Sequence, residues 1–286
     1  QDFDSAVQQA VNRIQSPQQT FDVLHAAREN GFRSVSVDLI YGLPHQSVKS
    51  FANTLDEIVS VEPDRLSIFN YAHLPQMFKP QRRINEDDLP SAQEKLDILT
   101  MTAEHLQNSG YIYIGMDHFA KPDDELAVAQ REGTLYRNFQ GYSTHSECDL
   151  IGFGVTSIGM VGGSYSQNFK SMDDYINAID NQQLAVFRGL QLTQDDLIRR
   201  DVITGLICNF KLTFKAVEKR WQLDFAEYFA DELQALKPMQ DDGLVTVDAD
   251  GIEVQTKGRF LIRNVCMVFD AYMQQHQKTG RFSKVI

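Results

Sequence analysis

Residues 34–44 read SVSVDLIYGLP, a run rich in β-branched residues that ends at a glycine and a proline. Polar and apolar types alternate little over the second half of residues 34–41, which is typical of a strand buried on both faces of a parallel sheet. A helical pattern precedes the run. It starts with Ser16 as N-cap and Pro17 in the first turn and extends to Gly31. The region therefore predicts a helix followed by a buried strand.

Two further helix-strand pairs follow the same plan. Ser47 caps a helical pattern that leads to RLSIFNY at residues 65–71, and Ser91 begins another that leads to YIYIGM at residues 111–116. Three pairs of this spacing favour β/α units around a parallel sheet, either part of a (β/α) barrel or an open doubly wound sheet. In both architectures functional side chains gather at the carboxyl ends of the strands.

The rest of the chain changes character twice. Residues 117–150 predict a polar loop region with a short helix near residues 124–131, and residues 151–163 (IGFGVTSIGMVGG) are glycine-rich, which suggests close backbone approach or bulged strands. A helix is predicted from Met172 to Asn181. From residue 194 the pattern is helix, helix, helix, a hairpin over residues 243–256 and a long helix over residues 258–276.

The predicted organisation is two domains, residues 1–193 and residues 194–286. The order of elements in the second resembles a winged helix. Its charges nearly balance, with 13 basic and 14 acidic residues, whereas DNA-binding domains are usually basic. A packing module is therefore the favoured interpretation of this domain.

The composition argues against a membrane protein, a nucleic-acid-binding protein and a disulfide-rich protein. Of the 286 residues 42% are hydrophobic and 23% are charged, the ordinary range for globular proteins, and the net charge of -12 repels phosphate backbones. The sequence contains no uncharged apolar run of about 18 residues, so no membrane-spanning helix is predicted. Cys148, Cys208 and Cys266 lie too far apart for a disulfide framework or a CxxC site. We expect a cytoplasmic protein with no membrane or nucleic-acid partner.

Polar residues in and after the predicted strands are the first functional candidates. Asp38 lies inside a hydrophobic run, so it serves either a functional site or a structural role as an acceptor of backbone N–H bonds. His73 follows the second strand, and Asp117 and His118 follow the third. These four residues could ligate zinc or iron, but no HxH or HExxH spacing supports a metal site. The sequence has no GxSxG motif, the usual mark of a serine hydrolase, so that enzyme class is not expected.

Arginine clusters are the second class of candidates. Surface solvation is their ordinary role, but a substrate with several carboxylates would favour guanidinium groups as partners. The clustered arginines are Arg82, Arg83, Arg131, Arg137, Arg199 and Arg200.

The segments VDLIYGLP, SIFNYAHLP, GMDHFAKPDDELAVAQREGTLYRNFQGY and LICNF closely resemble the oxygen-independent coproporphyrinogen III oxidases, which are radical S-adenosylmethionine (SAM) enzymes. The resemblance covers essentially the whole chain. It implies an α/β fold, in which part of a (β/α)6-type partial TIM barrel is followed by a mostly helical, winged-helix-like domain. It also implies SAM and a [4Fe-4S] cluster as cofactors.

This chain departs from the family pattern in one respect. The family binds its cluster through CxxxCxxC near the amino terminus, and the three cysteines here cannot replace that motif. We therefore expect no metal ligands in this chain. The absent motif and the start at Gln1 suggest the carboxyl-terminal part of the enzyme, inactive in isolation.

The resemblance also implies site residues and a reaction. Arg13 would pair with the SAM carboxylate, Asp38 would accept from a ribose hydroxyl, and Gln1 would hydrogen-bond a polar edge, while Ala72 and Ile158 would line the adenine. A 5'-deoxyadenosyl radical would start the oxidative decarboxylation of two propionates of coproporphyrinogen III to vinyl groups, giving protoporphyrinogen IX. The resemblance identifies no catalytic side chain, electron donor or electron acceptor.

The expected partner is coproporphyrinogen III. The full-length protein is expected to be a monomer, whereas the fragment would dimerise through its open barrel edge. Two alternatives remain: a non-catalytic porphyrin-binding or nucleic-acid-binding module, and a barrel-type metal hydrolase.

Overall fold

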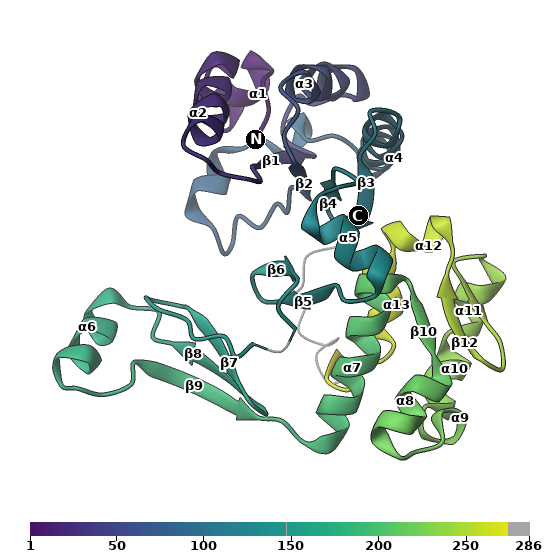
Figure 1. Ribbon diagram of the computed structural model, residues 1–286. Coiled ribbons are helices and arrows are strands. Elements are labelled where there is room, and N and C mark those ends of the chain that lie inside the picture. Colours follow the sequence, from purple (N-terminus) through teal and green to yellow (C-terminus); the bar gives the residue numbers. More distant parts are fainter. Residues whose placement is uncertain (147, 274–286) are drawn as a thin grey trace. The chain divides into compact units, whose positions relative to one another are not determined.

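The computed structural model describes residues 1–146 and 148–273. The described chain forms two compact units, residues 1–132 and residues 133–273 (Figure 1). The predicted boundary at residues 193 and 194 falls inside the second unit, between a strand and a helix. It stays a prediction. No helix in the described residues is both long and apolar enough to cross a membrane.

The first unit alternates helices with strands. Its helices begin where the sequence supplies a cap: the side chains of Ser16, Ser47 and Ser91 accept backbone N–H bonds at the starts of three of them. The predicted helices are thereby confirmed. The elements are α1 (Ser5–Ala10), α2 (Pro17–Glu29), β1 (Ser36–Tyr41), α3 (Val48–Ser60), β2 (Arg65–Asn70), η1 (Lys79–Arg83), η2 (Glu86–Asp88), α4 (Ala92–Asn108), β3 (Ile112–Gly115), β4 (His118–Ala120) and α5 (Glu125–Glu132).

The sheet of the first unit has the order β1-β2-β4-β3. Strands β1 and β2 are parallel, but β4 pairs antiparallel with both β2 and β3. The prediction of a parallel sheet was therefore wrong for this hairpin, and His118 belongs to a strand rather than to a loop. The chain reverses in a two-residue turn at Met116 and Asp117, where Met116 has a positive φ of 53°, and Gly115 at the end of β3 also has a positive φ, of 139°.

Strand β1 lies at one end of this sheet order, and its burial alternates. Ser36 and Asp38 are exposed, whereas Leu39 and Tyr41 are buried. The prediction that residues 34–41 are buried on both faces was wrong, because the face that carries Ser36 and Asp38 is left exposed. Leu39 and Tyr41 belong to the buried core, as do Phe51, Leu55 and Ile58 of α3.

The second unit combines antiparallel sheets with a helical part. Strands β5 and β6 form a hairpin, β7-β8-β9 form a sheet, and β10-β12-β11 form another. The predicted hairpin over residues 243–256 is confirmed by the pairing of β11 with β12. The elements are β5 (Tyr136–Asn138), β6 (Gly141–Ser143), β7 (Ile158–Val161), β8 (Ser164–Asn168), α6 (Met172–Asp180), β9 (Val186–Gln191), α7 (Gln194–Asn209), β10 (Lys211–Thr213), α8 (Phe214–Trp221), α9 (Phe225–Tyr228), α10 (Ala230–Ala235), α11 (Lys237–Asp241), β11 (Val245–Val247), β12 (Gly251–Val254), α12 (Thr256–Phe260) and α13 (Ile262–Met267).

Aromatic rings form the centre of the helical part. Phe214 stacks on Phe225 with ring centroids 4.2 Å apart. The Phe229 ring lies 4.8 Å from that of Phe225 and 5.5 Å from that of Phe269. Offset and edge contacts of this kind add to the stabilisation from burial alone. They join helices that are separately too short to be stable.

The single long helix predicted over residues 258–276 was wrong in its described part. The chain forms α12 and α13 instead, with a break at Leu261 (φ -106°, ψ 20°). Residues 274–276 lie outside the described residues. The break lets Ile262, Val265 and Cys266 turn into the core, which the apolar periodicity of the sequence could not distinguish from one continuous helix.

Candidate functional site

A hollow of about 270 Å³ lies along β1 in the first unit. Gln1, Arg13 and Asp38 all line it, with Thr20 and Leu24 of α2 on another side. Three of the five residues proposed to contact SAM are thus brought together by the fold. Among the described residues, the side chains of Arg13 and Asp38 form no hydrogen bond or ion pair, and both are exposed. An acid and a guanidinium group in one hollow can bind a ligand that carries both hydroxyl and carboxylate groups.

A buried acid holds the first residues against the sheet. Asp2 is only 3% exposed and accepts hydrogen bonds from the Thr54 hydroxyl and from the Gln46 side chain. Gln46 also donates to the carbonyl of Ile40, whose own N–H donates to the carbonyl of Gln1 at 2.9 Å. This network fixes Gln1 beside β1, because a buried carboxylate tolerates few other arrangements.

A second buried amide shapes the loop that carries Arg13. The Gln8 side chain donates to the carbonyls of Asp2 and Gln15 at 2.8 and 2.7 Å and accepts from the Gln15 N–H at 3.0 Å. The sequence patterns did not single out Asp2, Gln8 and Gln46. They lie in short or irregular segments, where no periodicity separates a buried polar side chain from an exposed one.

Asp38 belongs to a polar row across the sheet. In register it pairs with Ser67 of β2, and Ser67 pairs with His118 of β4. Paired residues on neighbouring strands share a face, so the three side chains lie on one face of the sheet. Asp38 is exposed at the end of this row. Its place in a hydrophobic run therefore needs no structural partner, which removes the reason for the alternative reading as a buried structural acid.

The segment after β2 contains Ala72 and His73. The Gln81 side chain donates to the carbonyl of Ala72 at 3.0 Å and so fixes the loop. His73 lies 3.1 Å from the Tyr71 hydroxyl, and its Nε2 is 3.5 Å from Glu86. Within the described residues no three His, Cys, Asp or Glu side chains form a group that could hold a metal ion. The geometry lends no support to the metal site considered for Asp38, His73, Asp117 and His118.

Asn70, one of the polar residues at the end of the second predicted strand, lies near Lys95, which the sequence patterns did not single out. Asn70 ends β2, and its Oδ1 is buried with no hydrogen-bond partner among the described residues. Burial lowers the pKa of Lys95 on α4. A Cβ at Gly42 would lie 3.0 Å from Lys95 Cε and 3.4 Å from Asn70 Oδ1, so both approach the end of β1. In the sequence, the only signal at position 95 is a lysine within a helical pattern.

The second unit contains a larger hollow of about 560 Å³. It lies among the β5 hairpin, strands β7 to β9, helix α7 and residues 269–272. Arg137, Arg199 and Arg200 line it, so three of the six clustered arginines meet in one place. Arg82, Arg83 and Arg131 belong to the first unit and are exposed, and Arg82 donates to the carbonyl of Pro75.

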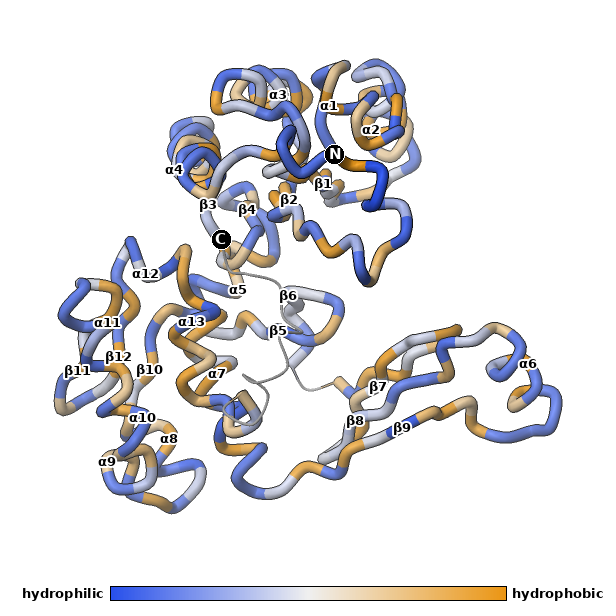
Figure 2. Tube along the Cα trace, turned by 180° about the vertical axis from the view of Figure 1, so that it is seen from behind, coloured by the Kyte–Doolittle hydropathy of each residue, from blue (hydrophilic) through white to orange (hydrophobic). Residues whose placement is uncertain are grey.

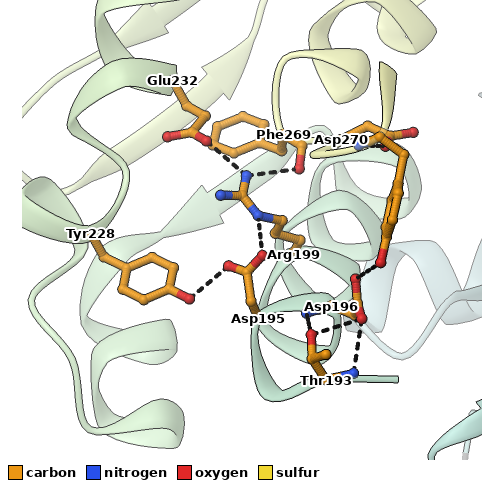
Figure 3. A network of polar contacts seen from close by, with 9 residues as sticks. Thr193, Asp195, Asp196, Arg199, Tyr228, Glu232, Phe269 and Asp270 are labelled. Carbon is orange, nitrogen blue, oxygen red and sulfur yellow. Dashed lines mark hydrogen bonds and ion pairs between the residues drawn. The ribbon is translucent and has the colours of Figure 1, made fainter. Parts of the chain in front are cut away.

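Arg199 is already engaged within this hollow. It contacts Asp195 at 2.8 Å and Glu232 at 2.7 Å, and it donates to the carbonyl of Phe269 at 3.2 Å (Figure 3). Burial alone would lower the pKa of Arg199, but the hydrogen bonds to Glu232 and Asp195 raise it. Arg199 therefore holds α7, α10 and the segment after α13 together, and it has little capacity left for a ligand.

Ile158 begins β7 within the glycine-rich segment of residues 151–163. The glycines are required there because the chain folds back on itself. A Cβ at Gly152 would lie 2.9 Å from the Ile158 carbonyl oxygen, and one at Gly159 would lie 3.1 Å from the Leu150 carbonyl oxygen. The close approach suggested by the sequence is thus an approach to the chain's own backbone.

The cysteines do not form a ligand set. Cys148 is exposed, and Cys208 and Cys266 are buried. Burial raises the pKa of each buried thiol to about 12. Thiolates are the species that bind iron, so these two side chains do not suit a cluster.

Comparisons with known proteins give consistent relatives. Residues 192–261 match the protein family described as HemN C-terminal domain. The oxygen-independent coproporphyrinogen III oxidase of Salmonella typhimurium is 56% identical over 286 residues, which are 100% of this chain and 63% of that protein. The protein of the same name from Thermostichus vulcanus is 48% identical over 288 residues, which cover 100% of this chain and 88% of that protein.

One solved structure is similar over nearly the whole chain. It is coproporphyrinogen III oxidase (HemN) from Escherichia coli, described as a radical SAM enzyme, with a TM-score of 0.93 and 57% sequence identity. The match covers 95% of this chain and 63% of that one. The chain therefore spans less than two thirds of the length of several of its relatives.

Proposed function

The chain belongs to the oxygen-independent coproporphyrinogen III oxidase family, and from this we propose that it is part of a radical SAM enzyme that converts coproporphyrinogen III to protoporphyrinogen IX. The reaction is the oxidative decarboxylation of two propionate side chains to vinyl groups. The observation that carries the proposal for this chain is the hollow along β1, where Gln1, Arg13 and Asp38 meet.

The side chains in this hollow suit the polar parts of SAM. Arg13 would bind the carboxylate of its methionine part, because a guanidinium group pairs with a carboxylate in a planar, two-pronged contact. Asp38 would accept a hydrogen bond from a ribose hydroxyl, and Gln1 would bind a further polar edge. Ala72 and Ile158 would contact the adenine. When bound, SAM supplies the 5'-deoxyadenosyl radical that abstracts hydrogen from the propionate.

The cluster does not fit the residues of this chain. The cysteines lie at positions 148, 208 and 266, and the thiols of two are buried and protonated. Cluster ligands need thiolates close together. We propose that these 286 residues alone hold no cluster and catalyse no decarboxylation, and that they contribute SAM contacts and substrate contacts.

SAM binding by the 286-residue chain tests the proposal for the hollow. Replacing Arg13 with Gln or Asp38 with Asn is expected to weaken binding about 10-fold or more, since a charged hydrogen bond contributes about 1.5–3 kcal/mol. Isothermal titration calorimetry with SAM measures the change in Kd. Asp22→Asn is the matched control, because Asp22 is an exposed acid on α2 outside the hollow. Unchanged affinity in both variants would remove these residues from the site.

The reaction itself needs a longer protein. An anaerobic assay of a full-length protein that contains this chain and a CxxxCxxC segment should yield protoporphyrinogen IX, detected after oxidation as protoporphyrin IX. Absence of product from a protein with a reconstituted cluster would contradict the proposed activity. The alternative, a non-catalytic porphyrin-binding module, predicts porphyrin binding without product.

A further inference from the structure

The hollow of the second unit has walls suited to an apolar ring system. Phe139 and Tyr165 meet edge to face with centroids 5.1 Å apart, and Phe139 is 53% exposed. The volume of the hollow, about 560 Å³, lies within the range of roughly 300–1,000 Å³ that is usual for small-molecule sites. Apolar side chains complete the walls: Met160, Leu190, Leu192, Ile203, Ile207 and Phe269.

Two arginines in this hollow have no acidic partner. In the described part of the chain, neither Arg137 nor Arg200 forms an ion pair with Asp or Glu. Arg137 lies in the β5 hairpin with its guanidinium carbon 5.6 Å from the centre of the Tyr142 ring, and its Nε is buried without a hydrogen-bond partner among the described residues. A buried guanidinium nitrogen without an acceptor is costly unless a ligand supplies one.

Arg200 has only weak partners. Its Nη1 lies 3.3 Å from the Tyr165 hydroxyl and 3.7 Å from Met160 Sδ, and its guanidinium carbon lies 6.0 Å from the centre of the Tyr165 ring. These contacts orient the group toward the β7-β8 side of the hollow and leave its charge uncompensated. Arg199, the next residue along α7, differs because Asp195 and Glu232 neutralise it.

The acids that line the hollow are occupied elsewhere. Asp196 accepts from the Thr193 N–H and hydroxyl and from the Tyr272 hydroxyl. Asp270 accepts from the N–H of Tyr272 at 2.9 Å. Neither acid pairs with Arg137 or Arg200, so the hollow presents two guanidinium groups that form no ion pair among the described residues, beside aromatic and aliphatic walls.

We propose that Arg137 and Arg200 bind propionate carboxylates of the tetrapyrrole substrate, while the apolar walls of the same hollow contact its ring body. Of the six clustered arginines, these two combine a place in the hollow with the lack of an acidic partner. Guanidinium groups bind carboxylates in two-pronged contacts that ammonium groups cannot reproduce. The inference rests on the proposed function, which supplies the identity of the ligand.

Porphyrin binding by the 286-residue chain tests this inference without SAM or a cluster. The probe is coproporphyrin III, the fluorescent oxidised form that keeps all four propionates. Arg137→Gln and Arg200→Gln should each raise its Kd about 10-fold or more, as expected for loss of one charged hydrogen bond. Arg200→Lys should fall between wild type and Arg200→Gln. Arg188→Gln is the matched control, because Arg188 lies on β9 outside the hollow and contacts Gln167.

A second probe separates carboxylate binding from loss of fold. Coproporphyrin III tetramethyl ester keeps the ring and loses every negative charge, so it should bind wild type and variants equally in the same low-detergent buffer. Equal Kd values for coproporphyrin III in wild type, Arg137→Gln and Arg200→Gln would overturn the inference, as would no binding to the wild-type chain. Failure of the proposed function would appear separately, as absence of protoporphyrin in the full-length assay.

Discussion

Single glycines in the second unit show how close backbone contacts constrain individual residues. Gly258 lies in the middle of α12, and a Cβ there would overlap the carbonyl oxygen of Leu244. Gly243 has φ 70° but open space around it. The first glycine is required by packing and the second by backbone conformation.

The two positions predict different costs for the same substitution. Gly258→Ala should destabilise the protein by about 3 kcal/mol or more, because the backbone of β11 or α12 must move. Gly243→Ala should cost about 1–2 kcal/mol, the strain of a left-handed alanine. Urea unfolding followed by circular dichroism measures both. Similar losses for the two variants would show that the contact with Leu244 relaxes easily.

The first turn of α7 is held by hydrogen bonds from its capping residues. Thr193 and Asp196 form a reciprocal capping box, and the Tyr272 hydroxyl donates to Asp196 at 2.8 Å (Figure 3). Burial alone would raise the pKa of Asp196, but the hydrogen bonds from Thr193 and Tyr272 lower it below the ordinary 3.8. The ionised carboxylate therefore stabilises this end of the helix.

The lowered pKa predicts a pH-dependent contribution to stability. A depressed pKa in the folded state gives stability that is present above the unfolded value and is lost as pH falls through the folded value. Asp196→Asn should cost about 1 kcal/mol near neutral pH, and the difference from wild type should shrink below about pH 4. Urea unfolding from pH 7 to pH 3 measures it. Asp241→Asn in α11 is the control, and a difference that stays constant with pH would contradict the argument.

At the scale of the whole molecule, apolar side chains remain exposed on the β7-β9 sheet and α6. Leu184 is 86% exposed, Phe187 54% and Ile176 47%, and Figure 2 shows hydrophobic stretches along β7 and β9. Strand β1 of the other unit pairs on one side only among the described strands. Exposed apolar surface and a strand edge without a second neighbouring strand among the described residues both favour association between copies.

Self-association of the 286-residue chain can be assigned to one of these two surfaces. We expect dimers through the β1 edge, so Val37→Lys should lower the mass measured by light scattering at high protein concentration, because a lysine hinders pairing at a strand edge. Leu184→Lys is the comparison on the second unit. Loss of the dimer in Leu184→Lys alone would assign association to the β9 and α6 surface, and a monomeric wild type would contradict dimerisation altogether.

The elements were largely predictable because their signals are local. Ser16, Ser47 and Ser91 cap helices that begin where the sequence places them, and turn residues mark the β11-β12 hairpin. The errors arose where pairing partners are distant along the chain. The placement of β4 between β2 and β3, the exposed face of β1 and the break at Leu261 depend on neighbours that periodicity does not encode.

The sequence by itself determined the family resemblance, the candidate residues and the lack of a CxxxCxxC motif, because residue types and short spacings carry that information. Only the tertiary structure decided which candidates meet. It brought Gln1, Arg13 and Asp38 to one hollow and Arg137 and Arg200 to another, and it engaged Arg199 with Asp195 and Glu232. The physical reason is that a guanidinium group's availability depends on the acids packed around it, and for Arg199 one of them, Glu232, comes from a helix 33 residues further along the chain.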